Sequence, residues 1–249
     1  MRTITSLVNN LLQLAGLELR RVQKGAYSKG CYETLYPWAS YAPWRKSEEF
    51  WQIYSAIEGY TLADLYRCWE LWDLASQCEI LPGHFLEVGT WRGGTAAILC
   101  SCAARLGGGR RVYIADTFSG VPKATERDSS YTGGEHSDTS EETVERLLRD
   151  SLGLHNYRIL KGIFPDATGQ AIEQEVICLC HIDVDVYESS KGVLDWLLPR
   201  LCRGGLAVID DYGFSSTPGI TESVNELRGH ADLISLYNLN GHAVLIKIK

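Results

Sequence analysis

The 249-residue sequence lacks several features that would place it in a special class. It has no run of Lys or Arg and a formal net charge of −7, which excludes an obvious nucleic-acid partner. No apolar stretch reaches membrane-spanning length. Asn9, Asn10 and Gln13 interrupt the apolar N-terminus, and no cleavage site follows, so it is not expected to be a signal peptide. We expect a cytoplasmic protein without an integral membrane segment.

The eight cysteines lack Cys-x-x-Cys spacing, and no histidine stands at zinc-ligand distance from them in sequence. Cys178 and Cys180 alternate within an apolar run, and Cys100 and Cys102 lie in a helical pattern. A chain of this length can build a full core without disulfides. We expect buried, reduced thiols.

From residue 85 onward, strand and helix patterns alternate. The strands are predicted at 85–89, 111–116, 157–161, 177–184, 205–210, 233–238 and 243–248. The helices are predicted at 93–106, 140–151, 166–173, 188–201 and 219–229. Such alternation predicts an α/β fold with a doubly wound, mostly parallel seven-stranded sheet. Asn240-Gly241 indicates that the last two strands form an antiparallel edge hairpin.

Residues 1–80 are interpreted as a helical N-terminal extension that forms a lid and the acceptor pocket, with residues 81–249 as the main domain. A helix is predicted over 62–81, with Thr61 as N-cap and Pro82-Gly83 as its end. An amphipathic first helix with a basic end is expected to pack on its own domain or on a second subunit rather than rest on a membrane. A homodimer is expected. The aromatic residues before position 55 form a lid, a substrate platform or a small satellite core. They are Tyr36, Trp38, Tyr41, Trp44, Trp51 and Tyr54. The polar stretch between Val121 and Thr143 is predicted to be a lid or disordered.

Two acidic segments follow apolar runs of strand character. Asp183 and Asp185 come after the run that starts at Val176, and Asp210 and Asp211 come after the run that starts at Gly205. The carboxyl ends of parallel strands are where open α/β sheets bind ligands. Four carboxylates meeting there would repel each other, and a hard divalent cation such as Mg²⁺ would relieve the repulsion. Helix or turn capping is the structural alternative for each pair.

A glycine-rich turn, Glu87-Val-Gly89-Thr90-Trp91-Arg92-Gly93-Gly94, links the first strand to a helix. It lacks the Lys of a phosphate-binding loop. Trp91 stands where a dinucleotide fingerprint requires its middle glycine, which argues against an NAD-dependent oxidoreductase. S-adenosylmethionine has no phosphate and fits the turn better. Asp116, at the end of the second strand, would bind the ribose hydroxyls, or else cap a turn.

The third strand leads into Gly162-Ile163-Phe164-Pro165-Asp166. This segment either holds the adenine ring, with Gly162 allowing close approach, or forms an ordinary turn capped by Asp166. Both interpretations remain open.

With these motifs in place, the chain resembles the macrocin O-methyltransferase family of metal-dependent sugar O-methyltransferases. The resemblance runs from Glu58 to the C-terminus and rests on six ordered motifs. They begin at Glu58, Glu87, Asp116, Gly162, Asp183 and Gly204. Leu62 and Thr117 depart from residues common in the family.

The resemblance implies a class I methyltransferase (Rossmann-like) fold and a set of site residues. The metal ligands would be Asp183, Asp210 and Asp211. Asp185 would be the general base, with Asp183 as the alternative. Cofactor contacts are expected from Tyr60, Thr61, Glu87, Gly89, Thr90, Gly93, Asp116, Thr117, Gly162, Ile163 and Asp183. His136 could also serve as a base, whereas His181 is interpreted as a packed strand histidine.

These observations predict an O-methyltransferase that uses S-adenosylmethionine and Mg²⁺ or a similar cation. The acceptor is expected to be a small-molecule glycoside or sugar with adjacent hydroxyls. A catechol or phenolic acceptor is the alternative within the same chemistry. A nucleotide-dependent oxidoreductase and a non-catalytic binding module are the alternatives from other classes.

Overall fold

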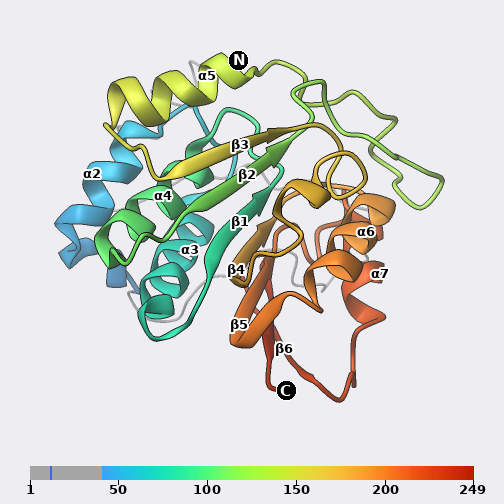
Figure 1. Ribbon diagram of the computed structural model, residues 1–249. Coiled ribbons are helices and arrows are strands. Elements are labelled where there is room, and N and C mark those ends of the chain that lie inside the picture. Colours follow the sequence, from blue (N-terminus) through green and yellow to red (C-terminus); the bar gives the residue numbers. More distant parts are fainter. Residues whose placement is uncertain (1–11, 13–40) are drawn as a thin grey trace. The chain divides into compact units, whose positions relative to one another are not determined.

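A computed structural model describes Leu12 and residues 41–249 (Figure 1). Residues 42–249 form one compact unit. The predicted first helix, together with Tyr36 and Trp38, lies outside the described residues. The predicted domain boundary at residue 80 remains a prediction, and residues 42–80 belong to the same compact unit as the sheet. Within the described part, none of the helices has the length and apolarity needed to cross a bilayer.

A seven-stranded sheet organises this unit, with the strand order β3-β2-β1-β4-β5-β7-β6. Its strands are β1 (His84–Val88), β2 (Val112–Asp116), β3 (Tyr157–Lys161), β4 (Ile177–Ile182), β5 (Leu201–Ile209), β6 (Leu233–Tyr237) and β7 (Ala243–Lys247). The first five pair in parallel, whereas β7 is antiparallel to both β5 and β6. The predicted fold class and the predicted hairpin are confirmed.

Burial explains why the central strands consist of unbroken apolar runs. All six residues of β4 are buried, and so are four of the five in β1. A strand covered on both faces has no solvent side and therefore shows no alternation. The edge strand β6 alternates half-buried and exposed residues because only one of its faces meets the core.

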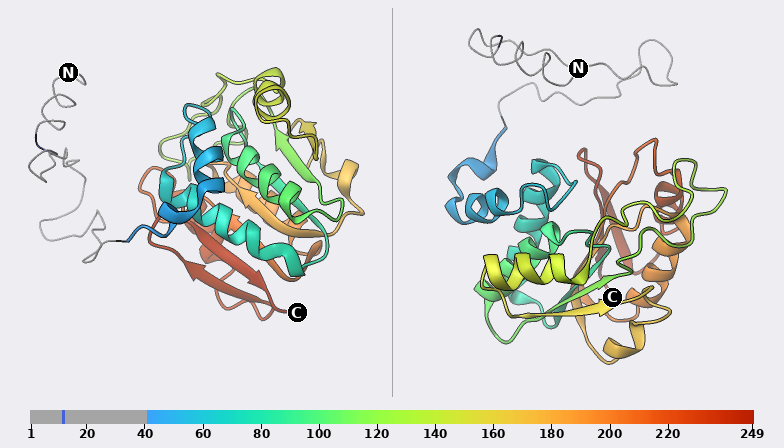
Figure 2. Two further views of the ribbon diagram at one scale, coloured as in Figure 1. Left: turned by 90° about the vertical axis from the view of Figure 1, so that its left-hand side faces the viewer. Right: turned by 90° about the horizontal axis from the view of Figure 1, so that it is seen from above.

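Helices cover both faces of the sheet (Figure 2). One face is covered by α2 (Glu48–Ala56), α3 (Leu65–Gln77), α4 (Gly94–Leu106) and α5 (Glu141–Glu145). The other face is covered by α6 (Tyr187–Leu197) and α7 (Pro218–Asn225). Short helical turns complete the fold: η1 (Pro43–Lys46), η2 (Cys78–Ile80), η3 (Arg146–Ser151) and η4 (Gly169–Ile172).

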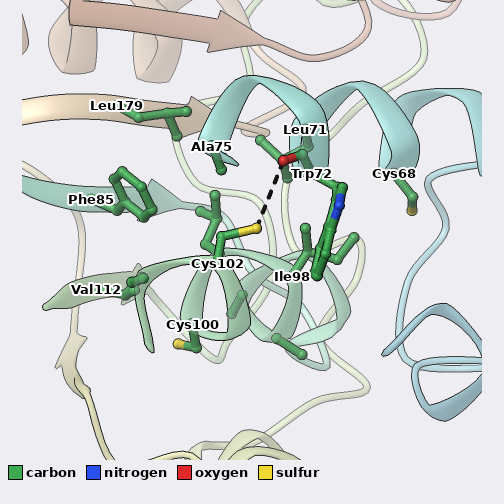
Figure 3. Packing of buried hydrophobic residues seen from close by; sticks show 14 of the residues in the cluster. Cys68, Leu71, Trp72, Ala75, Phe85, Ile98, Cys100, Cys102, Val112 and Leu179 are labelled. Atoms are coloured by element: carbon green, nitrogen blue, oxygen red, sulfur yellow. Dashed lines mark hydrogen bonds between the residues drawn. The ribbon is translucent and has the colours of Figure 1, made fainter. Parts of the chain in front are cut away.

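Most aromatic residues near the start of the described chain lie in or against the main hydrophobic core, whereas Tyr41 is exposed. Phe50 is fully buried, and its ring packs against Trp51, Tyr54, Trp69 and Trp72. Figure 3 shows Trp72 over α4, where the Cys102 thiol donates to the Trp72 carbonyl oxygen. The predicted core is confirmed for Trp44, with Trp51 and Tyr54 packed against it, and the substrate platform stays a prediction.

Three predicted helices differ from the structure. The helix predicted over 62–81 begins at Leu65, because Asp64 rather than Thr61 caps it by accepting from the Tyr66 and Arg67 amides. The segment 166–173 contains only the short turn η4. The helix predicted over 140–151 is α5 followed by the π-helical turn η3.

Candidate active site

A cavity of about 300 Å³ lies at the carboxyl ends of the parallel strands. Val88 and Gly89 at the end of β1, Asp183 after β4 and Asp211 after β5 all line it. The strand order reverses between β1 and β4, and this switch point is where open α/β sheets form their ligand crevice. The sequence-predicted acidic segments and glycine turn therefore share one cavity.

The acidic segments meet because β4 and β5 are neighbours in register. Ile182 pairs with Ile209, so the next residues, Asp183 and Asp210, leave the sheet side by side. Carboxylate oxygens of Asp183, Asp185 and Asp211 lie within 4.8 Å of one another. Such a group of hard oxygen ligands fits Mg²⁺ or Ca²⁺.

Burial and mutual repulsion disfavour the charged forms of these carboxylates. Burial, and then the charge of Asp210, raise the pKa of Asp183 well above its ordinary value. The same two causes raise the pKa of Asp211 to about 7. Burial also raises the pKa of Asp185, although the hydrogen bond from Tyr131 opposes the shift. A bound cation would reverse these shifts by favouring the ionised carboxylates.

The backbone around the cavity is unusual. Six non-glycine residues in the described chain have positive φ, and four of them line the cavity: Trp91, His136, Asp185 and Asp211. Asp185 and Asp211 both have φ of 63°. Left-handed conformations cost energy for most residues, and such outliers gather at functional sites. The turns after β4 and β5 therefore hold these two carboxylates at a defined place.

Asp210, beside this group, pairs with Arg67 of α3. The Arg67 Nη1 atom lies 2.8 Å from both carboxylate oxygens of Asp210 and 3.2 Å from Asp211 Oδ1. Burial alone would lower the pKa of Arg67, but the Asp210 carboxylate raises it. Asp210 is 2% exposed and forms a second potential metal-binding group with His181 and His242.

The glycine turn is shaped by close backbone contacts. A Cβ at Gly89 would meet the Asp183 carbonyl oxygen at 1.7 Å, so glycine is required where β1 passes β4. The Asp116 carboxylate accepts hydrogen bonds from the backbone amides of Thr90, Trp91 and Phe118. Asp116 thus acts as a turn cap in this structure and also lines the cavity, where its remaining lone pairs can accept from a ligand.

The predicted site residues divide into two sets. Nine of them line the cavity: Thr61, Gly89, Thr90, Asp116, Thr117, Gly162, Asp183, Asp185 and Asp211. Five do not: Tyr60, Glu87, Gly93, Ile163 and Asp210. Glu87 is completely buried, and its carboxylate accepts from the Thr95 hydroxyl and lies 3.3 Å from His181 Nδ1. His181 is a packed strand histidine, as expected.

The stretch between Val121 and Thr143, predicted as a lid or disordered, is a loop as far as Ser140 and crosses the carboxyl ends of the strands (Figure 1). Tyr131 donates to Asp185 Oδ1 at 2.6 Å. Asp128, 3% exposed, accepts from the Tyr187 amide at the start of α6. Asp138 accepts from the Trp91 indole at 2.8 Å and pairs with Arg92 at 2.6 Å. These hydrogen bonds and the ion pair connect the loop to the acidic segment at Asp185 and to the glycine-rich turn at Trp91.

Sequence reasoning missed Arg67, Tyr131 and Asp128. Arg67 lies four residues before the buried Leu71, so helical spacing could have revealed a cation on the inner face of α3. Asp128 and Tyr131 lie in a polar loop, where no periodicity marks the residues that turn inward.

The strand order, the antiparallel last strand and the cavity at the switch point define a class I methyltransferase of the S-adenosylmethionine-dependent type. The chain belongs to the family described as macrocin-O-methyltransferase (TylF), which it matches over residues 55–244.

Individual relatives agree with this assignment. The chain is 35% identical to mycinamicin III 3''-O-methyltransferase of Micromonospora griseorubida, over 59% of this chain and 61% of that one. It is 31% identical to 8-demethyl-8-(2,3-dimethoxy-alpha-L-rhamnosyl)-tetracenomycin-C 4'-O-methyltransferase of Streptomyces olivaceus, over 60% of this chain and 59% of the relative. The matched part thus spans about three fifths of each relative. The solved structure of the O-methyltransferase NovP superposes with a TM-score of 0.65 at 25% identity, covering 76% of this chain and 83% of NovP.

Proposed function

We propose that this chain is an O-methyltransferase that moves a methyl group from S-adenosylmethionine to a sugar hydroxyl of a glycosylated natural product. The observation that carries the proposal is the meeting of three carboxylates with the glycine turn in one cavity. The two relatives described above are named for methylation of such compounds, one of them for a rhamnosyl derivative. S-adenosylmethionine supplies an electrophilic methyl group, and the protein must supply a deprotonated, aligned hydroxyl oxygen.

A divalent cation fits the acidic group. Asp183 and Asp211 would hold it, because they line the cavity and their pKa values are raised by burial and then by neighbouring negative charge. Bound there, the cation would lower the pKa of a hydroxyl among its ligands. Asp210, the third ligand implied by the family resemblance, has its oxygens turned to Arg67 in this structure. Arg67 Nη1 also contacts Asp211 Oδ1, so this pairing does not separate the two aspartates, and Asp210 stays the proposed third ligand.

Asp185 is the proposed general base. Tyr131 donates to Asp185 Oδ1 and orients this carboxylate, which would take the proton from the acceptor hydroxyl. A sugar hydroxyl is a weak acid, so a positioned base is needed in addition to the cation. Thr61, Asp116 and Gly162 would contact the methyl donor, since they line the same cavity.

The test separates donor binding, cation binding and turnover. Calorimetry with S-adenosylhomocysteine should show binding to the wild-type chain and to the Asp183→Asn, Asp185→Asn and Asp211→Asn variants. Mn²⁺ binding, followed by electron paramagnetic resonance, should weaken at least about tenfold in Asp183→Asn and Asp211→Asn and persist in Asp185→Asn. Asp185→Asn should lose about 10²–10⁴-fold in turnover on a sugar acceptor. Failure of the wild-type chain to bind S-adenosylhomocysteine would refute the proposal, and turnover only on catechols would replace the sugar acceptor.

A further inference from the structure

The guanidinium group of Arg67 lies among the carboxylates at the ends of β4 and β5. Arg67 belongs to the first turn of α3 and lines the cavity, and its side chain is 11% exposed. Its Nη1 atom lies 2.8 Å from both carboxylate oxygens of Asp210 and 3.2 Å from Asp211 Oδ1. One permanent positive charge therefore contacts two of the three proposed cation ligands.

Protein donors already occupy the carboxylate of Asp210. Its Oδ1 atom accepts from the Asp211 amide at 2.8 Å as well as from Arg67 Nη1. A carboxylate oxygen has two lone pairs, so Oδ1 has none left for a cation. Oδ2 accepts from the same Nη1 atom and keeps one lone pair, but a cation bound there would be next to the guanidinium group. Asp210 is therefore fully available as a ligand only when Arg67 withdraws.

Electrostatics also sets the two cations against each other. A divalent cation held by Asp210 and Asp211 would lie close to Arg67 Nη1, and like charges repel strongly at short range in a partly buried site. Without any cation, the two neighbouring carboxylates would repel each other. The pair of aspartates is thus stabilised by one of the two cations and not by both together.

The other guanidinium nitrogens have partners outside the acidic group. Arg67 Nε lies 3.3 Å from Asp64 Oδ2, and Nη2 donates to the Leu62 carbonyl oxygen at 3.2 Å. Neither partner is a proposed cation ligand. Arg67 can therefore leave Asp210 and Asp211 while it stays paired with the N-terminal end of α3.

We propose that Arg67 is a competing cation within the site. It holds Asp210 and Asp211 in the metal-free protein, and a divalent cation replaces it and leaves it paired with Asp64. Arg67 thereby sets the cation concentration at which the site fills. This proposal rests on the proposed function, in which Asp210 and Asp211 are cation ligands, and it makes Arg67 a positioning residue.

Cation affinity in Arg67→Met is the main test, because Met is also long and unbranched but carries no charge. Mn²⁺ binding at pH 8, followed by electron paramagnetic resonance, should be about 5–150-fold tighter than in wild type, which is the range of a typical coupling between two sites. Arg67→Lys keeps the charge and should bind Mn²⁺ more weakly than Arg67→Met. The matched control Arg127→Met breaks the 2.9 Å pair with Glu222, and neither of these residues lines the cavity. This control should bind Mn²⁺ like wild type.

Stability with and without a cation separates competition from a purely structural role. In EDTA, Arg67→Met leaves the buried Asp210 carboxylate without its guanidinium partner, so the urea midpoint should fall below that of wild type. Saturating Mg²⁺ should raise the midpoint more in Arg67→Met than in wild type, because the cation no longer has to displace the guanidinium group. A purely structural role would lower the midpoint equally in both conditions.

A crystal structure of the wild-type chain with Mn²⁺ shows the exchange directly and requires no variant to fold. We expect Mn²⁺ on Asp210 and Asp211, with Arg67 paired to Asp64. Mn²⁺ binding in Arg67→Met that is unchanged or weaker than in wild type would overturn the proposal. So would a Mn²⁺-bound wild type in which Arg67 Nη1 still contacts Asp210. Binding of S-adenosylhomocysteine to wild type tests the proposed methyl transfer separately, so the two failures are distinguishable.

Discussion

Replacing Asp211 by Asn should stabilise the metal-free protein, although Asp211 is a candidate site residue. Burial and the charge of Asp210 raise its pKa from 3.8 to about 7. A raised pKa means that the folded state disfavours the charged form, so the wild-type chain loses stability as the pH rises between these two values. A shift of about 3 units corresponds to about 4 kcal/mol at pH 8 and to less than half of that at pH 5.

The Asn side chain removes the charge but still needs hydrogen-bond partners, so part of this gain is lost. We expect the free energy of unfolding of Asp211→Asn to exceed that of wild type by about 1–4 kcal/mol at pH 8. The difference should be smaller at pH 5. Urea denaturation in EDTA, followed by tryptophan fluorescence at both pH values, measures the difference. Saturating Mg²⁺ should stabilise wild type and leave the variant unchanged.

Asp210→Asn is the matched control with the opposite sign. Burial alone would raise the pKa of Asp210, but His242 and Arg67 together lower it below its ordinary value. A lowered pKa contributes stability above the unfolded value, and this contribution is lost as the pH falls. Asp210→Asn should therefore destabilise the chain at pH 8. If Asp211→Asn proved no more stable than wild type at pH 8, or if both variants shifted stability in the same direction, the electrostatic account of the site would be refuted.

Three further predictions concern the loop, the base and the core. Asp128→Ala should lower the free energy of unfolding by about 1–3 kcal/mol in urea, because it leaves the buried Tyr187 amide without its acceptor; an unchanged stability would contradict the capping role. Tyr131→Phe should move the acidic limb of the kcat/KM profile upward by up to about one pH unit, because the Tyr131 hydrogen bond lowers the pKa of Asp185, and a downward shift would exclude Asp185 as the base. Phe50→Ala should lower the free energy of unfolding by about 3–5 kcal/mol, since the ring is fully buried; thermal unfolding with S-adenosylhomocysteine checks whether donor binding survives in the folded fraction.

The sequence predicted the sheet well because burial leaves a local signal. The run 177–182 is apolar throughout, as a strand covered on both faces requires, and β4 occupies it. The ends of helices in short polar segments were harder to predict. Asp64 and Thr61 are both good caps, and only the observed amide contacts to Asp64 decide where α3 begins.

The sequence predicted which segments form the site, but it did not predict which side chains pair with one another. Both acidic pairs follow strands, so their meeting follows from sheet order. The division of the four aspartates between two groups depends on Arg67 and His242, which lie 143 residues before and 32 residues after Asp210. No local pattern contains such long-range pairings, because they arise from the packing of α3 and β7 against the sheet.

The hydrogen bond between Asp128 and Tyr187 joins positions 59 residues apart in the chain. A protease cut near residue 128, or a shorter loop in its place, would therefore affect more than access to the cavity. It would also expose the first turn of α6, which lies on the opposite face of the sheet from α4. If this loop is exchanged with that of a relative in order to change the acceptor, the new loop needs a carboxylate at the position equivalent to Asp128.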